Sequence, residues 1–250
     1  MYITTKGLIL RTADYKESSR MLTVLTESEG KISASAKGVR RKNSRLASGA
    51  QLYAYSELTF SKTAGRYNLT EASAIELFPG IGAGGLENLA LAAYFAELLD
   101  SVCREEIQEG ELLQLGLNAF YALSEGKKPR DILKGAFELR VMCLAGYAPP
   151  LSRCAVCGKP EPEQPALELD GEGLICASCA AATGRRTARL CPRSLAAMRY
   201  VASAEPKRVF SFSLDEDSAA RFSLAGEKYV SAQLERRFHT LDYYKEYSGI

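Results

Sequence analysis

Apolar and polar positions alternate in short runs over the first 80 residues of the chain. Turn-forming segments such as D-Y-K-E-S-S and T-A-G-R separate these runs, which are rich in Ile, Val, Leu, Thr and Tyr. This pattern is typical of β-strands. We predict five strands, at Ile3–Thr12, Arg20–Thr26, Lys31–Ala36, Leu52–Ser61 and Tyr67–Ile75. Five short strands with no helix between them favour a small barrel, and the five-stranded OB-fold is the expected form.

The spacing changes after Phe78. The segment F-P-G-I-G-A-G-G predicts a flexible connection, and apolar residues then recur at the i, i+3, i+4 spacing of buried helix faces. We predict helices at Glu87–Val102, Glu111–Ser124, Asp131–Ala145, Pro192–Ser203 and Ser218–His239, and we expect the last dozen residues to fray. The predicted fold class is therefore α+β, with an N-terminal OB-fold barrel at residues 1–80 and an α-helical domain at residues 81–250.

Composition is that of an ordinary globular protein, since 46% of the 250 residues are hydrophobic and 25% are charged. The net charge of +2 hides an asymmetry. Residues 1–80 hold 12 Lys and Arg against 7 Asp and Glu, whereas residues 81–250 hold 20 against 23. A basic N-terminal part indicates a nucleic-acid or other anionic partner for the predicted barrel.

The N-terminal segment has no continuous apolar core and no small-residue cleavage site, so it does not resemble a signal peptide. The most apolar segment, Leu86–Val102, carries several polar and charged residues and is a poor membrane span. We therefore expect a cytoplasmic protein without membrane association. In that compartment the seven cysteines are expected to be reduced thiols or metal ligands rather than disulfides.

Four cysteines carry the sharpest chemical signal. Cys154, Cys157, Cys176 and Cys179 form the pattern C-x2-C-x18-C-x2-C, the spacing of a four-thiolate zinc site. Two residues between paired cysteines let one tight turn direct both sulfurs at a single ion, and Gly158 can adopt the positive φ of such a turn. We predict one structural Zn²⁺ in a four-cysteine module at about residues 151–190. A closed four-sulfur site leaves no coordination position for catalysis.

Other interpretations of the cysteines remain open. The four could be unrelated thiols, or one C-x-x-C pair could be a redox pair. Cys191 is near enough in sequence to compete as a ligand, although it has no paired partner. Cys103 and Cys143 lie on helical stripes, where we expect buried small side chains.

The residue patterns of common enzymes are absent from the sequence. His239 is the one histidine, and there is no G-x-x-x-x-G-K-[ST] phosphate loop. The glycines of Gly80–Gly85 lack the βαβ surroundings of a dinucleotide site, and no paired-carboxylate motif stands out. We predict no catalytic residues and a protein that is not an enzyme.

A basic loop, Lys37–Arg45, reads K-G-V-R-R-K-N-S-R and follows the third predicted strand. Loops on an OB-fold barrel commonly contact nucleic acid, and clustered cations neutralise phosphates. Asn43, Ser44 and Ser48 add neutral donors. The predicted DNA-binding residues are Lys37, Arg40, Arg41, Lys42 and Arg45. The alternative is a solvated run of surface charge.

Tyrosines near the basic loop offer a second mode of nucleic-acid contact. Tyr53, Tyr55 and Tyr67 could stack on bases, as in single-strand binders. Alternation along a strand instead predicts that some of them are buried, and this is the stronger interpretation.

Several stretches together resemble the RecO family of bacterial DNA repair and recombination mediators. They are T-T-K-G-L-I-L-R-T, Y-K-E-S-S-R-M-L-T-V-L-T, A-K-G-V-R-R-K-N-S-R and F-E-L-R-V-M-C-L-A-G-Y-A-P-P, followed by the cysteine pattern. The resemblance implies an N-terminal OB-fold, a helical domain and a zinc module, in a cytoplasmic protein associated with the bacterial nucleoid. By position it assigns DNA binding to the basic loop and metal binding to the four cysteines.

The resemblance also implies a function and partners. Such proteins bind single- and double-stranded DNA, anneal complementary strands, and with RecR help RecA, indirectly, to replace single-stranded DNA-binding protein. Arg130, Lys134 and Arg140 are then candidates to bind the acidic tail of that protein, with Leu133, Phe137 and Val141 near an apolar pocket. The alternative is that these cations lie on solvated helix faces.

Two rival functions remain from the residues alone. An RNA- or ribosome-associated protein would use the same barrel and zinc module. A zinc-dependent hydrolase is disfavoured by the closed four-sulfur site.

Overall fold

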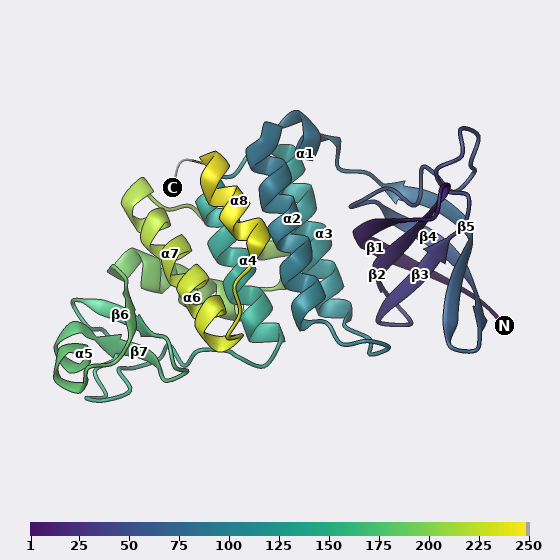
Figure 1. Ribbon diagram of the computed structural model, residues 1–250. Helices are drawn as coiled ribbons and strands as arrows, with labels where there is room; N and C mark the ends of the chain where they lie inside the picture. The colour runs from purple at the N-terminus through teal and green to yellow at the C-terminus, as the bar shows by residue number, and fades with distance from the viewer. Residues whose placement is uncertain (249–250) are drawn as a thin grey trace. The chain divides into compact units, whose positions relative to one another are not determined.

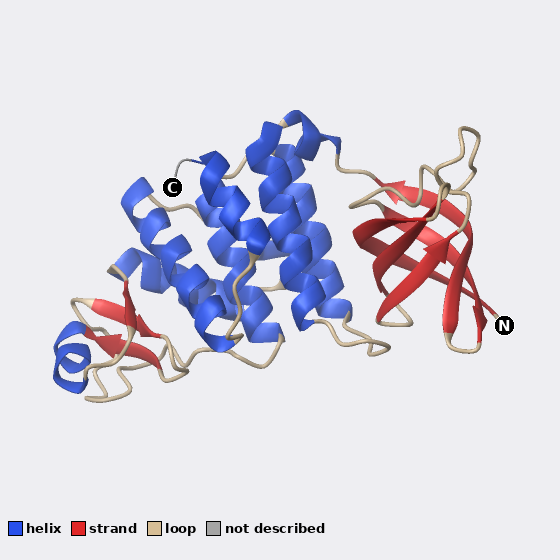
Figure 2. Cartoon of the chain, in the orientation of Figure 1, coloured by secondary structure: helices blue, strands red, loops and turns tan. Residues whose placement is uncertain are grey.

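The computed structural model describes residues 1–248, and its first 76 residues form a closed five-stranded barrel (Figures 1 and 2). The strand order around the barrel is β1-β2-β3-β5-β4. The strands are β1 Tyr2–Tyr15, β2 Ser19–Thr26, β3 Lys31–Ala36, β4 Tyr55–Thr63 and β5 Arg66–Glu76. The predicted OB-fold barrel is thereby confirmed, with β3 at its predicted bounds.

Strand β1 joins the two sides of the barrel. Its first half, Tyr2–Leu8, pairs with β4, and the stretch from Gly7 to Tyr15 pairs with β2. The register shifts between Ile9 and Arg11, and an irregularity of this kind bends a strand. A short parallel pairing of β3 with β5 at Ala34 and Tyr67 closes the barrel. Alternating buried residues from all five strands fill the interior.

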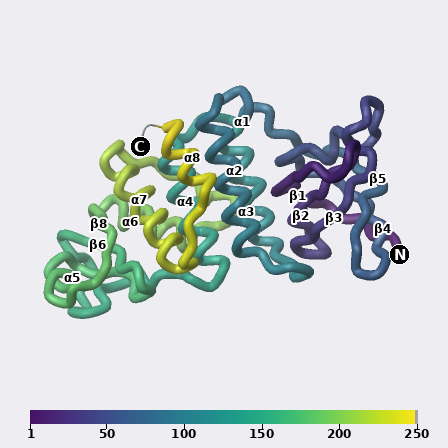
Figure 3. Tube along the Cα trace, in the orientation of Figure 1, coloured from purple at the N-terminus to yellow at the C-terminus, as the bar shows by residue number. Residues whose placement is uncertain are grey.

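Four helices belong to the same compact unit as the barrel. This unit comprises Met1–Ser124 and the segment from Phe238 onward. The helices are α1 Pro79–Ala83, α2 Gly85–Val102, α3 Gly110–Glu125 and α8 His239–Ser248. Helix α8 lies along α2, as Figures 1 and 3 show. The rings of Tyr94 and Phe238 are 5.7 Å apart, and Thr240 Oγ1 donates to Glu97 at 2.5 Å.

The second unit, Glu125–Arg237, combines helices with a small sheet. Its helices are α4 Arg130–Leu144, α5 Ala177–Thr183, α6 Pro192–Ser203, the short 3-10 helix η1 Pro206–Arg208 and α7 Glu216–Gln233. Strands β6 Pro165–Glu168, β7 Gly173–Cys176 and β8 Thr187–Arg189 form a sheet in the order β7-β6-β8. Glycines bring α4 and α7 close together, because a Cβ at Gly135 would lie 2.7 Å from the ring of Phe222.

Two sequence predictions were wrong at the level of elements. The glycine-rich connection after Phe78 contains helix α1, where Pro79 supplies a favoured first helical residue. The predicted helix Ser218–His239 stops at Gln233, and His239 instead begins α8, so the described part of the last dozen residues is helical. Apolar periodicity shows which residues are buried, but it does not show that one stripe is divided between two helices.

The structure also divides the chain differently from the sequence prediction, since the barrel shares its unit with α1–α3 and α8. The boundary at residue 80 stays a prediction about independent folding. Among the described helices, none combines the length and apolar character that crossing a membrane requires.

Candidate nucleic-acid interface and metal centre

The basic loop is a series of turns rather than an open coil. The Arg41 amide donates to the Gly38 carbonyl at 3.1 Å, and the Ser44 amide donates to the Arg41 carbonyl at 3.0 Å. A third bond ties the loop to the barrel, from the Arg40 amide to the Ser18 carbonyl at 3.0 Å. These bonds hold the backbone of the loop in one conformation.

Apolar side chains anchor the loop to the barrel. Val39 is 5% exposed and packs in the barrel core with Ala50, and Leu46 packs against the same cluster. Because Val39 and Leu46 point inward, their polar neighbours are left on the outside. The loop therefore presents its charges on a fixed scaffold, with little conformational entropy to lose when a ligand binds.

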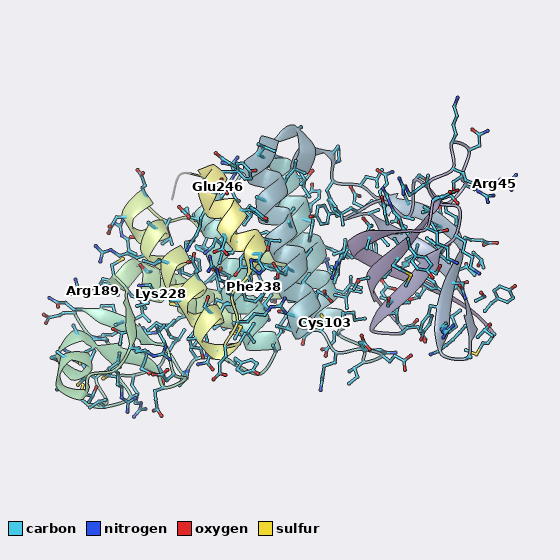
Figure 4. The ribbon with its side chains drawn as sticks, viewed as in Figure 1. Arg45, Cys103, Arg189, Lys228, Phe238 and Glu246 are labelled. Carbon is cyan, nitrogen blue, oxygen red and sulfur yellow. The ribbon has the colours of Figure 1, made fainter. Side chains whose placement is uncertain are left out.

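All five predicted DNA-binding cations are exposed. Arg40 forms an ion pair with Asp14 at 3.1 Å, and Asp14 also pairs with Arg20. Within residues 1–248, the side chains of Lys37, Arg41, Lys42 and Arg45 make no ion pair. Figure 4 shows Arg45 on the loop that stands away from the barrel. The loop is therefore a solvent-facing positive surface, and within the described part of the chain a carboxylate compensates it at Arg40 alone.

The nearby tyrosines mostly have structural roles. Tyr67 is 4% exposed within the barrel core, and its hydroxyl donates to Glu29 at 3.0 Å. The ring of Tyr53 packs 5.1 Å from that of Phe120, and burial raises the pKa of Tyr53 to about 12. The hydroxyl of Tyr55 donates to Glu27 at 2.6 Å. The prediction that strand alternation buries some of these rings is confirmed.

Beside the basic loop, the barrel surface has an open groove of about 770 Å³. Its lining includes Tyr15, Lys16, Lys37, Arg66 and Asn68. Tyr15 is 46% exposed, and Lys16 Nζ lies 5.3 Å from the centre of its ring. The groove thus combines cations with an accessible aromatic ring, which are the two groups that single-strand binders use.

Sequence reasoning missed Tyr15, Lys16 and Arg66. They come from D-Y-K-E-S-S and T-A-G-R, the turns that separate the predicted strands. The signal that could have found them is topological. In an OB-fold, the β1–β2 and β4–β5 turns flank the face that binds oligonucleotides.

Lys134 does not lie on a surface that a partner could reach. It is 2% exposed, and its ammonium lies 3.0 Å from Glu138 Oε1 and 3.1 Å from Glu227 Oε2. Burial alone would lower the pKa of Lys134, but the two carboxylates outweigh it and raise the pKa above its usual value. This burial corrects the interpretation of Lys134 as a residue that contacts a peptide.

The other residues of the predicted partner site also differ from expectation. Leu133, Phe137 and Val141 are each at most 1% exposed, so they are core residues rather than the wall of an open pocket. Arg140 is half-buried and donates to the Ala202 carbonyl at 2.7 Å near the end of α6. Arg130, at the start of α4, is half-buried as well. A role for Arg130 and Arg140 in partner binding stays a prediction.

The structure brings all four predicted metal ligands together. The Sγ atoms of Cys154, Cys157, Cys176 and Cys179 lie within 4.8 Å of one another, and Cys176 Sγ is 3.8 Å from both Cys154 Sγ and Cys157 Sγ. Tetrahedral coordination with zinc–sulfur bonds of about 2.3 Å places sulfurs about 3.8 Å apart. The donor set and its spacing therefore fit a metal ion such as zinc.

Two local turns position the sulfurs. In the first turn, the Gly158 amide donates to the Cys154 carbonyl at 2.9 Å, and Gly158 has a φ of +73°, as its predicted role requires. In the second, Cys176 precedes α5 and Cys179 lies in its first turn. Hydrogen bonds from Ser178 and from the Cys179 amide lower the pKa of Cys176 to about 6, which favours the metal-binding thiolate.

Buried aliphatic side chains also line the small sheet of the module, among them Leu167 and Leu174, which are both 0% exposed. Ala166 and Ile175 are the buried aliphatic residues that pack with Cys154 and Cys176. The hydrogen bond to Cys176 is the largest cause that raises the pKa of Cys179 to about 12, and repulsion from a charged Cys154 is a smaller one, so the cluster resists full ionisation. A bound cation would remove this repulsion.

The remaining cysteines lie elsewhere. Cys191 is the N-cap of α6, where its sulfur accepts from the Ser194 amide at 3.4 Å, and it is not part of the four-sulfur cluster. Cys103 is buried, as predicted, and burial raises the pKa of its thiol to about 12. Cys143 is half-buried.

Comparison with known protein families matches nearly the whole chain. A family model described as "Recombination protein O N terminal" matches residues 1–78, which contain the barrel. A second, "Recombination protein O C terminal", matches residues 84–242. The two matches occur in the order in which the barrel and the helices follow each other along the chain.

Curated relatives carry the same name. The "DNA repair protein RecO" of Acetivibrio thermocellus is 30% identical over 245 residues, covering 98% of this chain and 96% of that protein. That of Bacillus pumilus is 31% identical over 252 residues, covering 100% of this chain and 91% of that protein. That of Caldicellulosiruptor saccharolyticus is 33% identical over 178 residues, covering 71% and 72%. The chain therefore belongs to the RecO family of DNA repair proteins.

Proposed function

We propose that this protein is a non-enzymatic recombination mediator that binds single- and double-stranded DNA and anneals complementary strands. The observation that carries the proposal is the exposed basic loop, whose cations Lys37, Arg41, Lys42 and Arg45 have no carboxylate partner within residues 1–248. Its relatives are named DNA repair proteins, which agrees with a DNA ligand. The proposed activity needs no bond to be made or broken.

Annealing follows from electrostatics. Two DNA strands repel each other through their phosphates, and a cationic surface that neutralises them lowers this repulsion. The loop backbone is already fixed by Val39 and by hydrogen bonds. Binding DNA therefore costs the loop little conformational entropy. Phosphate contacts carry no base sequence, which suits a protein that must act on any damaged region.

The groove beside the loop would hold the strand itself. Its cations Lys16, Lys37 and Arg66 would follow the phosphates, while the exposed ring of Tyr15 would stack on a base. Ser33 and Ser35 line the same groove and offer hydroxyl donors to phosphate or sugar oxygens.

The metal is proposed to be Zn²⁺, with a structural role. Four thiolates occupy every position of a tetrahedral ion, so the metal would cross-link the two cysteine turns.

The proposal extends to protein partners. With RecR, the protein would help RecA to assemble on strands coated by single-stranded DNA-binding protein, and Arg130 and Arg140 remain candidates to meet the acidic tail of the coating protein. Tethering to that tail would raise the local concentration of the mediator on coated DNA.

The decisive test uses Arg41→Glu with Lys42→Glu in the full-length protein. We expect the affinity for single-stranded DNA to fall by about tenfold or more near 150 mM salt, and the slope of log K against log salt to fall by about 1.4, two phosphate contacts at about 0.7 each. Fluorescence anisotropy measures both, and annealing of two labelled strands should slow in parallel.

The matched control is Lys207→Glu with Lys228→Glu, which makes the same charge change on exposed residues of η1 and α7. DNA binding equal to wild type in the Arg41/Lys42 variant would refute the proposal. A matched RNA strand that binds much more tightly than DNA would instead favour the alternative, an RNA- or ribosome-associated protein.

A further inference from the structure

A second basic segment lies in the four-cysteine module. Residues 184–193 read G-R-R-T-A-R-L-C-P-R, with four arginines and no acidic residue. The segment contains β8, which is an edge strand of the β7-β6-β8 sheet. It resembles the basic loop of the barrel in charge density, but it belongs to the other compact unit.

Strand alternation sorts these arginines between two sides. Arg185, Thr187 and Arg189 line one open cavity of about 690 Å³. Arg186 lies at an alternate position and forms an ion pair with Asp170. The cavity therefore receives two of the arginines together with a hydroxyl group.

The charge inside the cavity is positive on balance. Arg221 of α7 joins Arg185 and Arg189, while Glu163 and Asp217 are the acidic lining residues. Asp217 is already paired with Arg221 at 2.9 Å. The carboxylate of Glu163 is 94% exposed and reaches Lys159 only at 4.0 Å, so it compensates the arginines weakly.

The two strand arginines are poorly neutralised by their surroundings. Arg185 lies 3.8 Å from Glu172, at the outer limit of an ion pair, and Arg189 makes no ion pair within the described part of the chain. Figure 4 labels Arg189 beside the small sheet. Arginine keeps its charge at all ordinary pH values and binds phosphate oxygens through a planar pair of donors.

The walls of the cavity favour a phosphate backbone over a peptide. The apolar lining consists of alanines, prolines and Leu190, with no aromatic side chain. A docked peptide usually buries a large anchor residue in a matching pocket, and a base needs a ring on which to stack. Arginines with Thr187 and Gln164 instead offer the charged and neutral donors that phosphates and sugars accept.

We propose that this cavity binds the phosphates of a nucleic-acid strand, as a second site besides the barrel. The inference rests on the proposed function and adds to it. With one basic surface on each compact unit, a single chain can hold two strands at once. Binding the second strand then becomes intramolecular, which raises its effective concentration near the first.

The test compares Arg185→Glu with Arg189→Glu against the control Lys207→Glu with Lys228→Glu, both in full-length, zinc-loaded protein. We expect the rate of annealing to fall by about tenfold or more, while affinity for one short strand falls only about two- to threefold, because the barrel still binds it. Arg185→Gln with Arg189→Gln should show the same order of effects, about half as large. Zinc content and circular dichroism equal to wild type confirm that the variants fold.

A second readout is positional. Photo-cross-linking of a bromouracil-containing strand should label peptides from residues 184–193 in wild type, and should still do so in the Arg41→Glu, Lys42→Glu variant. Cross-links to the barrel alone, or annealing equal to the control, would overturn the inference while leaving the proposed function intact. Loss of binding to an acidic peptide without loss of annealing would also overturn it, in favour of a peptide site. If wild type fails to bind DNA, the proposed function itself fails.

Discussion

On the barrel, four of the five loop cations face solvent with no carboxylate partner among residues 1–248, whereas on α4 the cation Lys134 is enclosed by Glu138 and Glu227. The barrel is filled by apolar side chains from five strands, whereas the buried cluster around the sulfurs adds only two aliphatic residues, Ala166 and Ile175, among the described residues. A domain that is stable through its apolar core leaves its charges free for a ligand. In the second unit, the ion pairs of Lys134 and the cysteine ligands belong to the structure itself.

We expect the largest effect on stability from removal of the metal ligands. Because structural zinc contributes about 10–16 kcal/mol of folding free energy in small zinc domains, Cys154→Ser with Cys176→Ser should unfold the four-cysteine module. Limited proteolysis should then cut within residues 151–190, and bound zinc should fall to background. The barrel, which has its own core, should stay resistant. Resistance of the module to protease in the variant would contradict its dependence on metal.

The next effect concerns the buried cation. Lys134→Met leaves Glu138 and Glu227 without their partner, and breaking a buried ion pair in this way costs about 3–5 kcal/mol. Denaturant unfolding measures the change. The control, Lys228→Met on the exposed face of α7, should alter stability by less than about 0.5 kcal/mol. Exchanging Lys134, Glu138 and Glu227 together for apolar residues should cost less than Lys134→Met alone.

A smaller effect should link the apolar core of the barrel to its charged surface. Val39→Ala removes two methyl groups, about 1.6 kcal/mol of burial, without changing any charge. If the scaffold matters, DNA affinity should fall as well, although every cation is retained. Calorimetry would measure the loss of stability, and anisotropy on the same sample would measure the loss of DNA affinity. An unchanged affinity would mean that the basic loop acts by charge alone.

The smallest expected effect is a pH dependence in the helical unit. A hydrogen bond from Arg193, and another from the Ser218 amide, hold the pKa of Asp215 below its usual value at the start of α7. A depressed carboxylate pKa stabilises the fold above the unfolded pKa of about 3.9, and that contribution is lost as pH falls below it. Asp215→Ala should therefore lower the melting temperature at pH 7, and the difference from wild type should shrink towards pH 3. A difference that is the same at both pH values would exclude this origin.

The sequence was sufficient for features that depend on local order. Strand alternation located the barrel, and the cysteine spacing located the four sulfurs to the residue. The burial of Lys134 between two carboxylates could not be predicted in the same way. Glu138 is visible as an i+4 neighbour, but Glu227 comes from a helix 93 residues later in the chain.

Tyr15 and the cavity beside β8 were missed for a related reason. Both sites are built from turns or edge strands, which apolar periodicity does not assign to any buried face. Their residues meet only when the sheets form. Helix α1 was missed because the glycines around Pro79 suggested flexibility, although the amide of Gly80 is bonded to Ser124 Oγ at 3.0 Å. Long-range contacts decided each of these cases.

Helix α8 has a consequence for how the protein is made. It completes the same unit as the barrel, with Phe238 against Tyr94, yet residues 125–237 are synthesised before it. During synthesis, part of the apolar face of α2 therefore stays exposed until residues 125–237 and then α8 have left the ribosome. Shortening the chain before residue 238 should create a product that chaperones retain, even though the basic loop, the arginines of residues 184–193 and the four cysteines are all present.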